Sequence, residues 1–390
     1  MKTPTYSQLA HRLETDDAPG WAVHSRALSL QRSGEDVVVL SIGDPDFRTP
    51  EPIVDNAISH LRVGRTHYSP ALGELNLRRA VADYESRVSP HNCSIDEVAI
   101  FAGVTSAIHS VLACLLDAGD EIVLVDPQYV GYEPIIRALD VVPVVVDAPA
   151  HQGFVPTYDS LVAAVTDKTQ VMFLNTPANP TGSIIGLDVL KQLAAFCQQR
   201  GIWLVCDEVY SMFTYERPHT SLRTAAEQLD NLVVIDGLSK SHAMSGWRMG
   251  WAVAPKALIE HLGRYATMSM FGCPQFIQDA SAFALNNDEY YVRDMCDIYR
   301  KRRDVVCDLV NASASLSCIV PEAGMFVMVD VSRVNADDVL FAESLLTEKR
   351  VSVLPGSAFG NTTRGHVRVS LVQPVEQLQT GCQRLIEFTS

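Results

Sequence analysis

Short apolar runs alternate with helical patterns through the middle of the chain, and this alternation limits the possible folds more than any other feature. Several runs are almost continuously apolar, which is typical of strands covered on both faces. Helical patterns such as 105–116 and 187–200 lie between the runs. The pattern predicts an α/β fold with a mostly parallel sheet sandwiched by helices. The expected strands are 97–101, 121–125, 141–146, 170–174, 203–206, 232–235 and 250–253.

The character of the sequence changes after residue 279. A long helical stretch at 289–311 is followed by short strand patterns at 324–329 and 366–371, with a helix at 337–349 between them. We expect a smaller α+β domain here. The predicted organisation has three parts: an N-terminal segment (1–40) packing near the small domain and the active site, a large domain (41–285) and a small C-terminal domain (286–390).

Composition excludes several classes of protein. The formal charge is −15, from 46 acidic and 31 basic residues with no basic block, which argues against a nucleic-acid partner. No apolar run approaches the roughly 20 residues that span a bilayer, and the N-terminus lacks a signal-peptide core. Nine cysteines are scattered without CxxC pairs, a pattern typical of reduced thiols. We therefore expect a cytoplasmic protein with no membrane segment and no metal site.

One of the seven lysines, Lys240, has an unusual setting. It lies in LSKSHAMSGWRMG (238–250), just after an expected strand and among small and apolar residues. Burial lowers the pKa of a lysine and provides a neutral amine for Schiff-base chemistry. The alternative is a loop lysine that extends its amine to solvent. Ligands of such sheets bind beyond the carboxyl ends of the strands, and Lys240 follows one of these ends.

Other motifs occur with Lys240 in a fixed order. They are GDPDF (43–47), THYSPALG (66–73), NTPANPTG (175–182), DEVY (207–210) and RVSL (368–371). With these motifs the chain resembles the class I and II aminotransferases, from about residue 43 to residue 371. The resemblance implies pyridoxal 5'-phosphate (PLP) as cofactor and the fold of the PLP-dependent transferases of fold type I.

The resemblance also assigns roles to the residues that react. Lys240 would form a Schiff base with the cofactor and then move the substrate's α-proton. Asp207, at a strand end, would keep the ring nitrogen protonated. Tyr210 and Asn179 would bind the phenolic oxygen of the cofactor. Taken alone, Asp207 with its neighbouring glutamate could equally cap a helix.

A phosphate needs backbone N–H groups and a cation. Gly103, Val104 and Thr105 open a helix after a strand, so their N–H groups form an anion site. Arg248 matches the family's phosphate-binding arginine. Tyr68 matches a tyrosine that reaches the phosphate of the neighbouring subunit, which implies a homodimer with shared active sites.

Three further positions belong to the cofactor site. Tyr129, in DPQYVGY, matches the aromatic residue that stacks on the pyridine ring, although a packed core tyrosine is the alternative. The family often has Ser or Thr three residues before the lysine, and this chain has Gly237. Ser239 could supply a hydroxyl instead.

The substrate's α-carboxylate would be bound by Arg368, whose two parallel N–H groups suit a carboxylate. Gly43 and Asn179 would assist. Within the family the chain is most similar to arginine–pyruvate transaminases, on segments 21–28, 270–280 and 324–330. This similarity implies transfer of the amino group of L-arginine to pyruvate.

A cationic side chain calls for carboxylates and an aromatic face near the cavity mouth. The N-terminal segment, which folds over the active site in related enzymes, supplies Glu14, Asp16, Asp17, Trp21 and His24. The alternative is a solvated acidic turn. The sequence shows no second arginine for a side-chain carboxylate, which disfavours an aspartate specialist.

Two other functions use the same scaffold. One is a PLP-dependent arginine oxidase that reacts with dioxygen, and the same lysine, aspartate and arginine would serve it. The other is a metabolite-sensing regulator of transcription. Such regulators carry a basic DNA-binding domain ahead of this region, whereas here about 40 residues that are not basic precede GDPDF.

Overall fold

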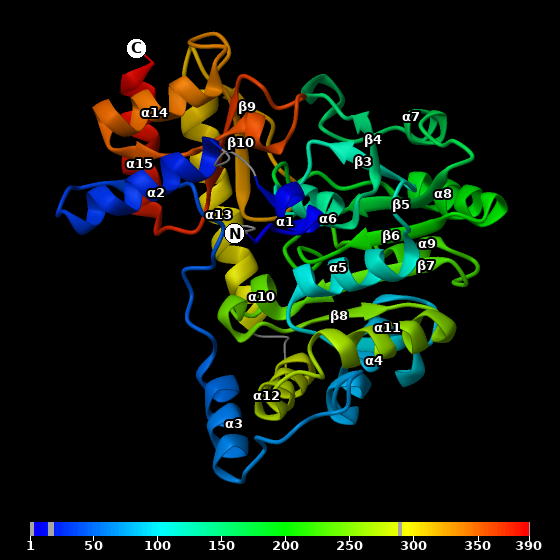
Figure 1. The fold of residues 1–390 in the computed structure, drawn as a ribbon. Helices are drawn as coiled ribbons and strands as arrows, with labels where there is room; N and C mark the ends of the chain where they lie inside the picture. Colours follow the sequence, from blue (N-terminus) through cyan, green and yellow to red (C-terminus); the bar gives the residue numbers. More distant parts are fainter. Residues whose placement is uncertain (1–3, 15–18, 288–290, 390) are drawn as a thin grey trace.

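A seven-stranded sheet forms the core of the larger part of the computed structural model, which describes residues 4–14, 19–287 and 291–389 (Figure 1). The strand order is β2-β8-β7-β6-β5-β3-β4, and only β8 runs antiparallel to its neighbours. The strands are β2 (Val98–Phe101), β3 (Glu121–Asp126), β4 (Val142–Asp147), β5 (Thr169–Asn175), β6 (Trp203–Asp207), β7 (Leu232–Gly237) and β8 (Gly250–Val253).

Helices cover both faces of this sheet, because alternate strand residues point to opposite sides. Phe173 and Val205 pack in the core beneath α5, α6 and α11, whereas Leu174 and Leu204 pack beneath α7, α8 and α9. The predicted α/β class is confirmed. The helices are α5 (Val104–Leu115), α6 (Tyr132–Leu139), α11 (Lys256–Ser269), α7 (Tyr158–Ala163), α8 (Leu187–Arg200) and α9 (Leu222–Ala225).

Strand β4 departs from the expected double coverage. It forms the edge of the sheet, and the side chains of Val142 and Val145 are each 46% exposed. Pro143, which lacks an N–H group, is tolerated in an edge strand. An apolar run of this kind therefore does not distinguish an edge strand from a central one.

A third cluster packs beside β2 and β8. Ile53 and Leu77 are fully buried there, together with Leu285. The elements are α3 (Glu51–Arg62), α4 (Leu75–Val88), η1 (Ile95–Glu97) and α12 (Gln275–Asn286).

The C-terminal third builds a second, smaller unit around a four-stranded antiparallel sheet, with a separate parallel pair, β1 with β11. Val23 and Ala27 of α2 are buried in its core. The domain boundaries themselves stay a prediction. The elements are α2 (Pro19–Arg32), β1 (Val38–Val39), α13 (Tyr291–Asn311), β9 (Ser317–Cys318), β10 (Phe326–Asp330), α14 (Asp338–Lys349), β11 (Val351–Ser352), β12 (Leu354–Pro355), η4 (Gly356–Phe359), β13 (His366–Ser370) and α15 (Val375–Phe388).

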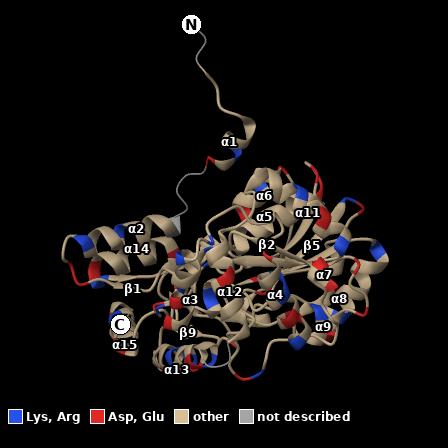
Figure 2. Ribbon diagram, turned by 90° about the horizontal axis from the view of Figure 1, so that it is seen from below, with Lys and Arg blue, Asp and Glu red and all other residues tan. Residues whose placement is uncertain are grey.

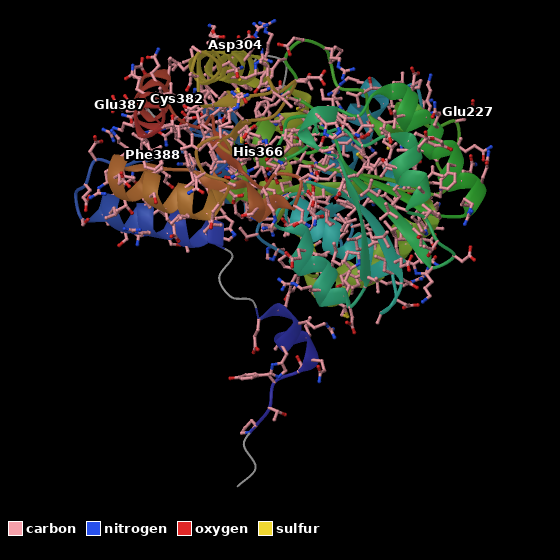
Figure 3. All side chains as sticks on the ribbon, turned by 90° about the horizontal axis from the view of Figure 1, so that it is seen from above. Glu227, Asp304, His366, Cys382, Glu387 and Phe388 are labelled. Carbon is pink, nitrogen blue, oxygen red and sulfur yellow. The ribbon has the colours of Figure 1, made fainter. Side chains whose placement is uncertain are left out.

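Helix α1 (Gln8–Leu13) projects from the rest of the molecule (Figure 3). It lies against the C-terminal end of α6, where Arg12 forms an ion pair with Asp140 at 3.2 Å. Acidic and basic residues are interspersed over the outer helices (Figure 2). Among the described helices, none combines the length and apolar character needed to cross a membrane.

Candidate active site

A cavity of about 490 Å³ lies beyond the carboxyl ends of β5 and β6, where the two units meet. Segments far apart in the sequence line it, because parallel strands end at one edge of the sheet. Twelve of the predicted site residues are among those that line it: Trp21, Gly43, Val104, Thr105, Tyr129, Asn179, Asp207, Tyr210, Ser239, Lys240, Arg248 and Arg368.

Lys240 lies on α10 (Leu238–Ser241), the short helix that follows β7. Its Nζ donates a hydrogen bond to the carbonyl oxygen of Gly43 at 2.7 Å. Burial lowers the pKa of Lys240 to about 8, and the charge of Asp44 opposes this shift while Arg368 and Arg248 add to it. A substantial fraction of the amine is therefore neutral near pH 8, as nucleophilic attack requires.

Asp207 is the last residue of β6 and is buried. Burial raises the pKa of its carboxyl group to about 6. Two hydrogen bonds act in the opposite direction: the Tyr132 hydroxyl donates to Oδ2 at 2.7 Å, and the Val209 N–H donates to Oδ1 at 3.1 Å. The sequence motifs did not identify Tyr132 as a residue of the site, although it lies only three residues after Tyr129.

A chain of hydrogen bonds joins Tyr210 to Arg368. Asn179 Nδ2 donates to the Tyr210 hydroxyl at 3.5 Å, and Arg368 Nη1 donates to Asn179 Oδ1 at 3.0 Å. Arg368 Nη2 donates to the carbonyl oxygen of Ser41 at 3.0 Å. These contacts fix the guanidinium group against the predicted cofactor side of the cavity.

Arg368 is buried between two aromatic rings, 4.0 Å from the Phe326 centroid and 4.8 Å from that of Phe359. Burial lowers its pKa to about 10, so it stays charged at neutral pH. Its Nε is buried and has no hydrogen-bond partner among the residues that the structure describes. A buried donor without a partner is costly, and an incoming carboxylate would lower this cost.

The proposed phosphate site depends on a glycine. Gly103 has a φ of +88°, and a Cβ atom there would lie 2.3 Å from Arg248 Nη2. Arg248 donates hydrogen bonds to the carbonyl oxygens of Ser245 at 2.7 Å and Ala102 at 3.4 Å. The guanidinium group thus lies close to the N-terminus of α5, where the helix dipole and free N–H groups favour an anion.

Packing explains the glycine at position 237. A Cβ atom there would lie 2.8 Å from the Met249 carbonyl oxygen and 2.9 Å from Val104 Cγ2. No side chain fits without a shift of the backbone, so a hydroxyl cannot come from this position. Ser239 lines the cavity instead.

Other predicted residues lie elsewhere. Tyr68 is 84% exposed, contacts Phe271 edge to face at 4.9 Å, and does not line this cavity. Its reach into a neighbouring subunit stays a prediction. Glu14 is exposed and lies 3.3 Å from His11 Nδ1. Asp16 and Asp17 are outside the described residues.

His24 does not line the cavity either. Its Nδ1 lies 2.9 Å from Ser41 Oγ, and its ring packs edge to face on Trp21 at 5.9 Å. Burial lowers the pKa of His24. His24 thus contacts Trp21, a side chain that does line the cavity.

The residues present fit PLP. The cofactor needs an amine for its aldehyde, a carboxylate for its ring nitrogen, a donor for its phenolic oxygen and an anion site for its phosphate. Lys240, Asp207, Tyr210 and Arg248 all line this one cavity and would supply these groups. Their arrangement beyond a mostly parallel sheet defines the PLP-dependent enzymes of fold type I.

Comparison with known proteins identifies the family. Residues 35–385 match the family described as aminotransferase class I and II, and the chain belongs to it. Its cofactor is PLP, and the chain is an aminotransferase. The chain is 38% identical to the arginine–pyruvate transaminase AruH of Pseudomonas aeruginosa, over 97% of both chains.

Two further comparisons involve Thermus thermophilus. The chain is 33% identical to the aspartate/prephenate aminotransferase of this organism, over 93% of this chain and 94% of that one. The solved structure of Thermus thermophilus aspartate aminotransferase with maleate has a TM-score of 0.93 and 32% identity, and it covers 99% of this chain and 100% of that one.

Proposed function

We propose that this aminotransferase moves the α-amino group of L-arginine to pyruvate, with Lys240 as the residue whose amine would hold PLP. The observation that carries the proposal is the 38% identity to an arginine–pyruvate transaminase, which extends over 97% of both chains. None of the relatives described above is named as an oxidase, so the oxidase hypothesis has no support from them. Because the chain belongs to an enzyme family, the regulator hypothesis has none either.

One carboxylate of the cavity wall that has no role in the proposed reaction favours a cationic substrate side chain. Three basic residues are among the described residues that line it, and each already has a proposed role: Lys240, Arg248 and Arg368. The remaining charged lining residue besides Asp207 is Asp44, a carboxylate. Trp21 adds an aromatic face, which suits a guanidinium group.

The residues divide the work as follows. Arg368, with Asn179, binds the α-carboxylate and thereby fixes the α-carbon relative to Lys240. Lys240 Nζ takes the α-proton and later returns one. PLP, when bound, supplies the conjugated ring that accepts the electrons of the broken C–H bond. Asp207 would keep the ring nitrogen of PLP protonated, and the Tyr210 hydroxyl would donate to its phenolic oxygen.

We also propose a homodimer with shared active sites, located in the cytoplasm. Large apolar side chains are exposed on and just after α3, on α11 and in the loop before α12, where Phe271 contacts Tyr68: Ile58, Leu61, Val63, Met268 and Phe271. Surfaces of this kind mark interaction sites. All nine cysteines are unpaired, as expected for a reducing compartment.

Steady-state transfer to pyruvate, followed as alanine formation, tests the donor. L-Citrulline is the matched control, since it replaces the guanidinium group by a neutral group of similar shape. We expect kcat/KM for L-arginine to exceed those for L-citrulline and L-aspartate by at least about tenfold, as the loss of one charged contact implies. Lys240→Ala should be inactive. Equal rates with citrulline, or a preference for aspartate, would refute arginine as the donor.

A further inference from the structure

The side chain of Tyr132 contacts Asp207, and Tyr132 has no role in the reaction proposed above. Tyr132 is the first residue of α6 and is 4% exposed. Its hydroxyl donates a hydrogen bond to Asp207 Oδ2 at 2.7 Å. We propose that Tyr132 is a positioning residue that keeps Asp207 ionised and aligned for the ring nitrogen of PLP. The inference rests on the role proposed above for Asp207.

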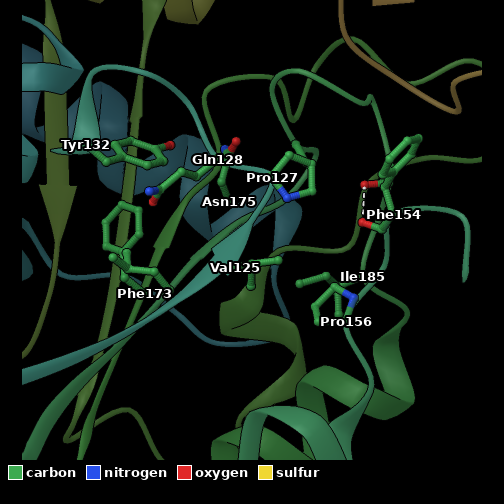
Figure 4. Close-up of a pocket in the computed structure, with 12 residues that line it drawn as sticks. Val125, Pro127, Gln128, Tyr132, Phe154, Pro156, Phe173, Asn175 and Ile185 are labelled. Atoms are coloured by element: carbon green, nitrogen blue, oxygen red, sulfur yellow. Dashed lines mark hydrogen bonds between the residues drawn. The ribbon is translucent and has the colours of Figure 1, made fainter. Parts of the chain in front are cut away.

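Aromatic packing fixes the Tyr132 ring. Tyr129 meets it edge to face with centroids 5.4 Å apart, and Phe173 does the same at 4.9 Å. Tyr132 and Phe173 lie at one end of a small cavity, with Phe154 and Ile185 at the other (Figure 4). This cavity of about 20 Å³ has room for about one water molecule. Because Tyr129 and Phe173 both pack against the Tyr132 ring, its hydroxyl stays in position to donate to Asp207.

Both oxygens of Asp207 are oriented by donors from the protein. The Val209 N–H binds Oδ1 and the Tyr132 hydroxyl binds Oδ2. Each carboxylate oxygen accepts more than one hydrogen bond, so a lone pair remains for the N–H of the ring. The two protein donors therefore fix the plane of the carboxylate before the cofactor arrives.

The same hydrogen bond favours the charged form of Asp207. Burial raises the pKa of this carboxyl group to about 6, the charge of Glu208 acts in the same direction, and Lys240 opposes it. Tyr129 and Tyr210 also face the carboxylate. Removal of the Tyr132 hydroxyl would raise the pKa further. A more basic carboxylate takes the shared proton from the ring nitrogen, and the ring then withdraws electrons less well.

Three variants test the inference: Tyr132→Phe, Asp207→Asn, and Tyr158→Phe as a control that removes the same atom on α7. Each holoenzyme is prepared with PLP labelled with 15N in its ring, and solid-state NMR reports the protonation of that nitrogen. The dissociation constant of PLP from each apoenzyme is a second readout. Tyr132→Phe should move the 15N shift towards the unprotonated value and weaken PLP binding about tenfold. Tyr158→Phe should do neither.

The outcomes separate the two assignments. If Asp207→Asn moves the 15N shift and Tyr132→Phe does not, the inference about Tyr132 is wrong and the role of Asp207 stands. If Asp207→Asn does not move it, the role of Asp207 is wrong and the inference fails with it. A Tyr132→Phe variant that melts earlier but keeps the wild-type shift and affinity would show a purely structural role, which also overturns the inference.

Discussion

At the residue scale the proposed chemistry depends on one buried amine. Burial and the neighbouring arginines hold the pKa of Lys240 near 8, whereas exposed Lys256, paired with Asp96 at 3.0 Å, has a raised pKa. Competitive labelling of the apoprotein with acetic anhydride, read by mass spectrometry across pH, measures both lysines. Labelling of Lys240 should rise with a midpoint near pH 8, because only the neutral amine reacts. Titration of Lys240 alongside Lys256 above pH 10 would contradict this expectation.

Motifs identified much of the cavity wall, since Lys240, Asp207 and Arg368 all line it. They did not identify Tyr132, because its contact with Asp207 joins residues 75 positions apart and depends on how α6 packs against β6. Nor could they predict that His24 contacts Trp21 and does not line the cavity itself. A single sequence shows which groups are present, but the side on which a helix presents them is set by tertiary packing.

At the element scale, two features of the turn from β2 into α5 require a glycine at position 103: the backbone conformation and the position of Arg248. Gly103 has a positive φ, and a Cβ atom there would also clash with Arg248, whereas Gly119, with a φ of +90°, has open space around its Cβ position. Gly119→Ala should therefore show only the cost of the backbone conformation, about 1 kcal/mol of unfolding free energy. Gly103→Ala should show that cost and also weaken PLP binding at least about tenfold, by displacing Arg248.

Urea unfolding and PLP titration of the two alanine variants measure these effects. Equal PLP affinity in both variants would mean that Gly103 has no part in the phosphate site.

The positions of the strands were predictable, whereas their pairing was not. The expected range 203–206 became β6 (Trp203–Asp207), and 250–253 became β8 without change. The apolar runs mark buried strands but carry no direction, so the antiparallel β8 could not be deduced. The exposure of β4 could not be predicted either, because it depends on which strand forms the edge of the sheet.

At the scale of the whole molecule the cavity forms only where the two units meet. Arg368 comes from β13 of the smaller unit, while Asp207 and Lys240 come from the larger sheet and the helix after it. In the proposed dimer the cavity would also include a residue from another chain, because Tyr68 would reach the cavity of the second copy. The exposed apolar surface around Phe271 is the expected contact.

Sedimentation equilibrium should therefore give twice the chain mass of 42.8 kDa. Phe271→Asp should shift the protein towards the monomer, because a charge buried at an interface is costly. Val320→Asp, on a residue that is 49% exposed in the smaller unit, serves as the control and should stay dimeric. A wild-type monomer at micromolar concentration would contradict shared active sites.

The most direct measurement gives L-arginine to the PLP-loaded enzyme without any 2-oxo acid, while dissolved oxygen and the 2-oxo acid product are followed together. An aminotransferase with this donor must stop after one amino group per active site, because the cofactor keeps that amino group until a 2-oxo acid accepts it. We predict one equivalent of 2-oxo acid per site, no oxygen uptake, and renewed turnover when pyruvate is added. Sustained oxygen consumption with many equivalents of product would show an oxidase and contradict the account.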